Sequence, residues 1–240
     1  MSVISDIYLG SAKSAFVRRG GEVLSPNPIR DGLVLWYDFK GRTNTDEQKG
    51  IAQDLSGNGN DGVLQNFAYQ NGSGFSNELE LDGIDDYIVI PDNPAVNPVN
   101  GASFEISLKA GKVGEYQRLI DKHYHNYSLA LWASNKIKLE VGNTYAGFSN
   151  TSIVQGEKYH IVGVQNQTNE IAEIWINGIL DFSIDTLGKL TPNGQSLYIG
   201  RGASKQNFTG ILYSARVYNR ALTPEEIQHN YQMEKERWNI

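Results

Sequence analysis

Alternation of apolar and polar residues dominates the middle of the chain and predicts a series of antiparallel strands. Apolar residues occupy every second position through residues 104–109 and again through residues 136–141. Because successive side chains of a strand point to opposite faces, this period gives each strand one apolar and one polar face. We therefore expect one face to be buried and the other to meet water, as in a β-sandwich. The same alternation through residues 211–218 predicts that Ile211 and Val217 share the buried face.

The stretch from Leu33 to Phe39 has a different pattern, because it is almost continuously apolar. Such a run predicts a strand that is buried on both faces inside the sandwich. Asp38 is the exception, and a carboxylate in a buried strand must be paired, hydrogen-bonded or bound to a metal. The sequence leaves two interpretations of Asp38 open, a side chain bonded to the backbone or a metal ligand.

Two further elements have sequence signatures of their own. Asn177-Gly178 lies between two apolar runs, which is the signature of a two-residue type I′ hairpin. Near the end of the chain, Thr223 is followed by a proline and then by Glu226, which is the spacing of a helix capping box. We expect a short C-terminal helix whose polar end, residues 234–237, lies in water.

Composition narrows the possible functions. The 240 residues suffice for one large all-β domain, and they include no cysteine, so neither a disulfide nor a thiolate metal site is expected. The net charge of −6 argues against a general nucleic-acid or anionic-membrane binder, because both need a basic surface. No apolar run is long enough for a membrane span, and residues 1–6 lack the features of a secretion signal. We expect neither nucleic acid nor a membrane as a partner.

Residues 1–31 differ from the rest of the chain and predict an N-terminal arm with a linker. Short apolar clusters are followed by a basic, glycine-containing segment at residues 18–21 and by Pro26 and Pro28, which favour an extended connection. An extra edge strand packed on the main domain is the alternative. We assign residues 1–31 to the arm and linker and residues 32–240 to the main domain.

The segment from Asp54 to Gly62 concentrates residues that favour a tightly shaped loop. Its glycines alternate with asparagine and aspartate, which tolerate positive φ angles and hydrogen-bond their own backbone. The same oxygen-bearing side chains could hold a hard cation such as Ca²⁺. The candidate metal ligands are Asp38, Asp54, Asn58 and Asn60. A self-bonded structural turn is the alternative, and the sequence leaves both open.

Three segments together resemble the laminin-G-like, concanavalin A-like jelly-roll family. They are residues 54–62, 79–91 and 208–227, which occur in the family's order. The resemblance covers roughly residues 32–232 and implies an antiparallel β-sandwich of the jelly-roll type. It also implies a function class, because the family is used mostly as a binding module, while the ligand stays open.

The region between residues 121 and 145 contains aromatic and amide side chains that suit a sugar ligand. An aromatic ring can pack on the apolar face of a sugar while an amide binds its hydroxyl groups. The candidate ligand-binding residues are Tyr124, Asn126, Trp132, Asn143 and Tyr145. For Trp132 a place in the core is the alternative. His123 and His125 lack an identifiable third metal ligand, so we interpret them as exposed turn residues.

Glu80, Asp82 and Asp85 are the nearest match to the paired carboxylates of glycosidases with this fold. A retaining glycosidase needs an acid and a nucleophile about 5 Å apart. Gly83 interrupts the strand between Asp82 and Asp85, so the pattern fails in detail. We therefore expect a protein that is not an enzyme and has no catalytic residues.

The hypothesis that fits these features best is a lectin-like module in a bacteriophage particle. The segment Asp6–Lys13 resembles N-terminal segments of phage virion proteins, which supplies the particle. We expect the module in the virion, as a head decoration, head fibre or tail protein that binds a cell-surface or extracellular glycan. It would contact other virion proteins through its arm and self-associate, for instance as a trimer. A cement protein without a sugar ligand and a glycoside hydrolase of the same fold are the alternatives.

Overall fold

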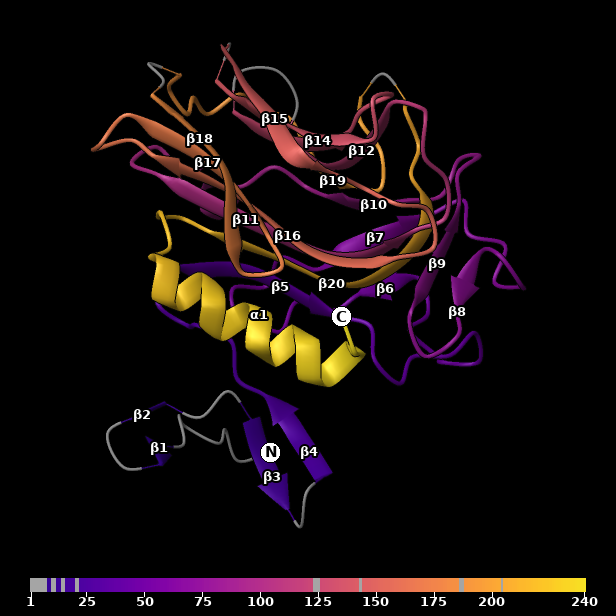
Figure 1. Ribbon diagram of the computed structural model, residues 1–240. Coiled ribbons are helices and arrows are strands. Elements are labelled where there is room, and N and C mark those ends of the chain that lie inside the picture. Colours follow the sequence, from indigo (N-terminus) through magenta and orange to yellow (C-terminus); the bar gives the residue numbers. More distant parts are fainter. Residues whose placement is uncertain are drawn as a thin grey trace.

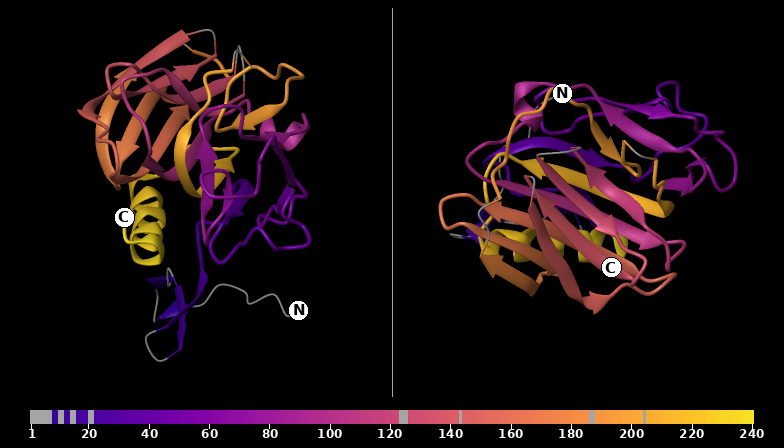
Figure 2. Two further views of the ribbon diagram at one scale, coloured as in Figure 1. Left: turned by 90° about the vertical axis from the view of Figure 1, so that its right-hand side faces the viewer. Right: turned by 90° about the horizontal axis from the view of Figure 1, so that it is seen from above.

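The computed structural model describes residues 8–9, 12–13, 16–19, 22–122, 126–142, 144–185, 188–203 and 205–240. Two antiparallel β-sheets lie face to face, and one helix packs on the outside of one of them (Figure 1). Figure 2 shows the same two layers from the side and from above. The architecture is therefore the all-β, two-sheet sandwich with one C-terminal helix that the sequence predicts.

We call one layer the open sheet, because the helix packs on the other layer. In spatial order its strands are β15 (Thr144–Ser152), β14 (Lys136–Val141), β13 (Tyr127–Leu131), β12 (Gln117–Asp121), β19 (Leu197–Ile199), β10 (Tyr87–Ile90), β7 (Gly62–Gln65) and β6 (Ile51–Ala52). Strand β19 pairs with β12 on one side and with β10 on the other. The sheet therefore places segments side by side that are far apart in the chain.

The other layer is the covered sheet. Its strands are β18 (Ile179–Asp185), β17 (Ile171–Ile176), β16 (Lys158–Asn166), β11 (Ala102–Ala110), β20 (Thr209–Tyr218), β9 (Leu79–Asp82) and β8 (Gly74–Phe75), with β5 (Leu33–Asp38) paired to β20. The helix α1 (Pro224–Trp238) lies against its outer face (Figure 1). A short 3₁₀ helix covers Pro94–Val96.

The apolar faces of the two sheets meet and form the core. Phe104 and Ile106 of β11 face Leu139 and other apolar side chains of the open sheet, and all three are fully buried. Strand β5 is buried on both faces, as its continuous apolar run predicts. Its Tyr37 lies in the core between the sheets, whereas Trp36 belongs to a second apolar cluster that includes Ile227 of α1.

The prediction of a solvent-exposed face is wrong for strand β11. Glu105 and Ser107 alternate with the core residues, yet both have no exposed surface. Helix α1 lies over this side of the covered sheet, so these polar side chains are enclosed between the sheet and the helix. Alternation in the sequence separates two faces correctly, but it does not show what each face meets.

The predicted register of β20 is also wrong in one half of the strand. Ile211 was expected in the core, but it is only half-buried, and Leu212 is fully buried there instead. The pairing of β11 with β20 shifts between Ser107 and Leu108, which marks a β-bulge. A bulge adds one residue to one strand and therefore reverses which side chains face the core beyond it.

Both turn and helix signatures are confirmed. Asn177 and Gly178 have φ angles of 51° and 73° between β17 and β18, as a type I′ turn requires. Thr223 caps α1, and its hydroxyl and the Glu226 side chain form the reciprocal bonds of a capping box. The expected solvated end of the helix is wrong at Glu234, which is fully buried against the covered sheet.

The N-terminal arm contains two hairpins that pair only with themselves among the described residues. They are β1 (Tyr8–Leu9) with β2 (Ala12–Lys13) and β3 (Phe16–Arg19) with β4 (Glu22–Pro26). After β4 the linker contacts α1, where the backbone N–H of Ile29 donates to Asn230 Oδ1 at 3.0 Å. Within the described residues, α1 is too short and too polar to cross a membrane.

Candidate functional site

The outer face of the open sheet carries a regular array of partly exposed side chains. On β14, Ile137, Leu139 and Val141 point into the core, whereas Lys138 and Glu140 lie on the outer face and are half-buried. This strand therefore has the polar face that its alternation predicts. Because α1 packs on the covered sheet, it leaves this face of the open sheet accessible.

One group of aromatic side chains lies over strands β12 to β15. The rings of Tyr116 and Trp132 are 4.3 Å apart between centroids, and those of Trp132 and Phe148 are 5.9 Å apart. The Lys138 ammonium lies 4.6 Å from the centre of the Trp132 ring. Trp132 is half-buried and is not part of the core between the sheets, which decides between the two interpretations of this residue.

Charged side chains hold this aromatic group in place. Lys138 Nζ pairs with Glu140 at 2.6 Å, and the Arg118 guanidinium pairs with Glu140 as well. Burial alone would raise the pKa of Glu140, but hydrogen bonds from Lys138 and Arg118 hold this pKa below its usual value. Burial raises the pKa of the neighbouring Tyr116 hydroxyl to about 12. The carboxylate is therefore a fixed hydrogen-bond acceptor that stays ionised.

A second aromatic group lies on the same face, over the adjoining strands β19 and β10. The rings of Tyr87 and Tyr198 are 6.0 Å apart, and the Arg201 guanidinium lies 4.4 Å from the centre of the Tyr87 ring. The register across the sheet places Asp121 of β12 opposite Tyr198. The two aromatic groups thus belong to one continuous outer face, which we call the aromatic face.

Of the five predicted ligand-binding residues, the structure describes the side chains of Trp132 and Asn126, and it does not bring these two together. Trp132 and Asn126 lie at opposite ends of β13, and only 1% of Asn126 is exposed. Its amide donates to Asn97 Oδ1 at 3.3 Å instead of pointing into solvent. Tyr124 and Asn143 lie outside the described residues, as do His123, His125 and the side chain of Tyr145.

Sequence reasoning missed most of the aromatic face. The missed residues are Tyr87, Tyr116, Phe148, Tyr198 and Arg201. For Tyr198 a signal existed, because it lies between two aliphatic residues of a short strand and must therefore face outward. For the others, the order of strands in the sheet decides the neighbours, and that order is not visible in a local pattern.

The loop from Asp54 to Gly62 is bonded mainly to itself and to β5. Asp54 Oδ1 accepts from the backbone N–H groups of Trp36 and Ser56, and its Oδ2 accepts from the Ser56 hydroxyl and the Asn60 N–H. The Asn58 amide donates to Leu33 O at 3.0 Å. These contacts are those of a self-bonded turn, and a cation would have to displace several of these donors.

Asp38, the fourth candidate metal ligand, is engaged elsewhere. Its two carboxylate oxygens accept from the Arg237 guanidinium of α1 at 2.6 and 3.1 Å. The backbone N–H of Lys40 adds a third hydrogen bond at 3.0 Å. Asp38 is thus the paired carboxylate that a buried strand demands.

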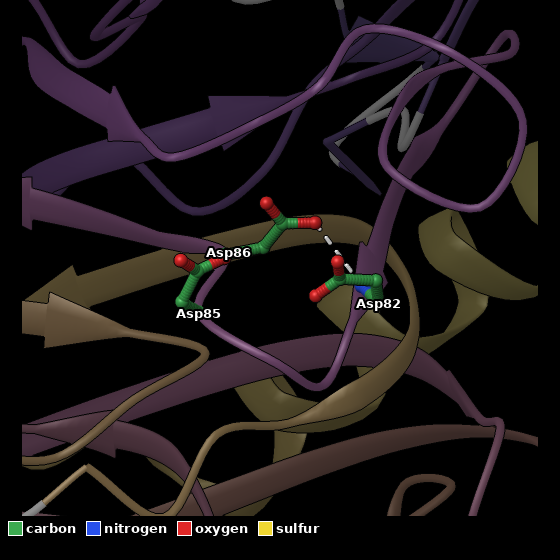
Figure 3. A group of neighbouring side chains, drawn as sticks. All are labelled: Asp82, Asp85 and Asp86. Atoms are coloured by element: carbon green, nitrogen blue, oxygen red, sulfur yellow. Dashed lines mark hydrogen bonds between the residues drawn. The ribbon is translucent and has the colours of Figure 1, made fainter.

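A different acidic group satisfies the spacing of a metal site. One carboxylate oxygen from each of Asp82, Asp85 and Asp86 lies within 4.8 Å of the others (Figure 3). Asp86 is fully buried, and its Oδ2 accepts from the Asp82 N–H at 3.1 Å. Burial raises the pKa of Asp86 despite the neighbouring Ser73 hydroxyl and this N–H. Oxygen ligands of this kind could hold a hard cation.

Two of the three carboxylates considered for catalysis, Glu80 and Asp82, lie on the sheet that does not carry the aromatic face. Glu80 and Asp82 are on β9 of the covered sheet, where both are half-buried and alternate with the core residues Leu79 and Leu81. Glu80 Oε2 accepts from the backbone N–H of Gly72 at 3.1 Å. Its contact is that of a side chain that holds a turn.

Comparisons with known proteins agree with this architecture. A family model described as the concanavalin A-like lectin/glucanases superfamily matches residues 82–228, more than half of the chain. A search of curated protein sequences found no significant match.

Among solved structures, a sialidase of Trypanosoma rangeli has a TM-score of 0.62 and 14% identity, and the match covers 92% of this chain and 35% of the sialidase. The receptor-binding domain of a botulinum neurotoxin of mosaic serotype C/D has a TM-score of 0.63 and 15% identity, over 85% of this chain and 51% of that one. A candidate carbohydrate-binding protein of Bacteroides ovatus has a TM-score of 0.53 and 15% identity, over 60% of this chain and 44% of that one. The chain thus spans about a third to a half of these proteins, and at such identities the likeness shows the shared fold.

Proposed function

Since the chain belongs to the concanavalin A-like lectin/glucanases superfamily, we propose that it is a non-catalytic module that binds carbohydrate on its aromatic face. The observation that carries this proposal is the set of half-buried rings around Trp132 and Tyr198, held beside fixed charged groups. Rings of this kind pack against the apolar face of a sugar, while carboxylates and cations bind its hydroxyl groups.

The charge state of Glu140 suits a hydrogen-bond acceptor and does not suit a general acid. A glycosidase requires a general acid, a carboxyl group whose pKa is raised so that it can donate a proton. On the aromatic face the pKa of Glu140 is lowered by Lys138 and Arg118. Such a carboxylate accepts hydrogen bonds from sugar hydroxyls and does not donate a proton. The assignment of a module without catalytic residues rests on the interrupted carboxylate pattern at residues 80–85.

Replacing Trp132 with alanine tests the proposal. We expect glycan affinity to fall by about tenfold or more, because a central aromatic anchor is typically worth more than 1 kcal/mol. Binding to an array of bacterial and host glycans, followed by calorimetric titration of the best ligand, measures the effect. Tyr231→Ala on α1 is the matched control, because this ring stacks on His160 on the opposite side of the sandwich.

Both outcomes of that experiment are informative. Thermal unfolding of each variant verifies that the fold is retained. If Trp132→Ala bound glycan as tightly as the unchanged protein, the glycan would not bind on the aromatic face around Trp132. A wild-type protein that binds no glycan would favour the alternative of a cement protein that makes only protein contacts.

Calcium is part of the proposal as a structural ion, with the Asp82, Asp85 and Asp86 group as the better candidate site. A ligand present at 100 times its dissociation constant stabilises the folded state by about 2.7 kcal/mol. For a protein of this size, we expect chelation to lower the melting temperature by about 5–10 °C.

Two variants locate the ion. Asp85→Asn alters the exposed member of the acidic group and should abolish the calcium-dependent shift, whereas Asp61→Asn in the glycine-rich loop should retain it. The opposite result would assign the ion to the loop. An identical melting temperature in calcium and in chelator would exclude a stabilising calcium ion.

The phage virion setting rests on the sequence of the arm and extends the proposal beyond the domain. In this setting, residues 1–31 attach the module to other virion proteins, and copies of the chain associate with one another. The solution mass of the full chain, compared with a chain that lacks residues 1–25, reports this association. Loss of an oligomer on truncation would support the arm as the attachment device, and an unchanged mass would argue against it.

A further inference from the structure

The arginines of the main domain differ in whether a carboxylate neutralises them. Those with an ion pair to aspartate or glutamate are Arg42, Arg118, Arg216, Arg220 and Arg237. Arg201 forms no ion pair with any described residue. Its Nε donates to the carbonyl oxygen of Gly202 at 3.2 Å, a contact that leaves its charge uncompensated.

Arg201 is nevertheless held in a defined position. Its guanidinium lies 4.4 Å from the centre of the Tyr87 ring, and its side chain is half-buried on the aromatic face. A guanidinium that stacks on an aromatic ring keeps its plane fixed. Of its five N–H donors, only the one on Nε has an acceptor among the described residues. The two Nη groups are therefore available to a ligand.

Tyr198 completes the surroundings of this cation. Its ring lies 6.0 Å from that of Tyr87, and its Cα is paired with Val89 of the neighbouring strand. Both tyrosines are half-buried, so each presents part of its ring to solvent. The guanidinium can bind the anionic group of an acidic sugar, and the neighbouring aromatic ring can pack against the sugar's apolar face.

We propose that Arg201, Tyr87 and Tyr198 form a subsite for the acidic group of a carboxylated or sulfated sugar. This inference rests on the proposed carbohydrate-binding function and specifies its ligand class. Carboxylates and sulfate esters both present paired oxygens that match the two Nη groups of arginine. A neutral sugar lacks such a group and can offer the guanidinium only hydroxyl oxygens, which are weaker acceptors.

The neighbouring aspartates that the structure describes do not form ion pairs with Arg201. Asp85 and Asp86 directly precede Tyr87 in the chain, but neither forms an ion pair with Arg201 among the described contacts. Asp86 is turned inward and accepts from the Asp82 N–H. The net charge of −6 repels an anionic ligand at long range, an effect that physiological salt screens within about 8 Å. The preference for an acidic over a neutral sugar is therefore decided by contact with the Arg201 guanidinium.

The test uses the full chain and three oligosaccharides of equal length and backbone, one neutral, one carboxylated and one sulfated. Calorimetric titration at fixed ionic strength gives each affinity. Arg201→Gln should weaken binding of the preferred acidic form by about ten- to a hundredfold and weaken binding of the neutral form much less. Arg201→Lys should recover little, because an ammonium lacks the planar fork. Lys235→Gln removes an equal charge from an exposed position on α1 and should have no effect.

Each result leads to a definite conclusion. A preference for the carboxylated or for the sulfated form that Arg201→Gln removes supports the subsite and identifies its ligand. Equal binding of all three forms by the wild-type protein overturns the subsite but leaves the carbohydrate-binding function intact. An acidic preference that survives in Arg201→Gln also overturns it, as does an equal loss for neutral and acidic forms. Failure of all three forms and of the glycan array overturns the proposed function itself.

Discussion

Replacement of Arg216 with methionine is expected to lower the free energy of unfolding by about 3–5 kcal/mol. Arg216 is fully buried between the covered sheet and α1, where it pairs with Glu105 of β11 at 2.9 Å and with Glu234 of the helix. Without the guanidinium, two carboxylates stay in an enclosed space with no cation. Removal of one partner from a buried ion pair is costly because the remaining charge has lost its solvation.

Urea unfolding at pH 7 measures this effect, with Arg42→Met as the matched control. Arg42 pairs with Asp46 in a partly exposed loop, so its loss should cost less than about 1 kcal/mol. A triple variant that adds Glu105→Gln and Glu234→Gln should regain part of the stability, since it removes the uncompensated charges. Equal stability of the Arg216 and Arg42 variants would mean that the buried charges are solvated in some other way.

A pronounced loss of stability in mild acid is the second expected result, and it originates at His160. This side chain on β16 is fully buried, and burial, aided by the charge of Arg216, lowers its pKa from 6.5 to about 3. Glu105 of β11 lies 3.8 Å from the imidazole, and Tyr231 of α1 stacks on it. Arg216 of β20 adds a positive charge on that side and itself pairs with Glu234 of α1.

The direction of the stability change follows from the pKa of His160 in the folded and in the unfolded protein. Above pH 6.5 His160 is neutral in both states, and its contribution to stability is complete. As the pH falls toward about 3, the unfolded chain binds a proton that the folded protein does not, so stability declines. The loss amounts to about 1.4 kcal/mol per pH unit, or about 2 kcal/mol at pH 5.

Urea unfolding at pH 7 and pH 5, compared between the wild-type protein and a His160 variant, measures this contribution. The difference between the two pH values should shrink by about 2 kcal/mol in His160→Phe, which retains a ring against Tyr231. His229→Gln is the control, since the His229 ring contacts Asn27 of the linker at 2.9 Å and is not enclosed in the same way. An undiminished pH dependence in His160→Phe would place the proton uptake elsewhere.

Local patterns were sufficient wherever one element decides its own structure. The hairpin at Asn177 and the capping box at Thr223 depend on residues within a few positions, and both are confirmed. Long-range partners explain the failures. Glu105 and Glu234 have the sequence pattern of solvated residues, and they are buried only because Arg216 lies between them in the folded chain. A polar face looks the same in the sequence whether it meets water or an oppositely charged element.

In the candidate site, too, local patterns identify single residues but not their long-range neighbours. Trp132 could be singled out because its own segment is rich in aromatic and amide residues. Tyr198 could be assigned to an outer face from its strand neighbours, but its place beside Tyr87 could not be predicted. The two tyrosines are separated by more than a hundred residues and become neighbours only through the pairing of β10 with β19. Arg201 is distinguished from the other arginines of the main domain by the absence of a carboxylate partner among the described residues, which no single segment reveals.

The contacts of Asn230 have a mechanical consequence. Its Oδ1 accepts from the Ile29 N–H of the linker, and its amide donates to Glu105 of the covered sheet and to the Tyr218 hydroxyl. The base of the arm is thereby tied to α1 on the outer side of the covered sheet, whereas the aromatic face is on the outer side of the open sheet (Figure 1). A pull between an anchored arm and a captured ligand would enter the domain at the linker, through β5 and through the contacts of Asn230 and His229 with the linker, and would then cross both sheets. The attachment point of the arm and the proposed ligand-binding face therefore lie on opposite sides of the sandwich.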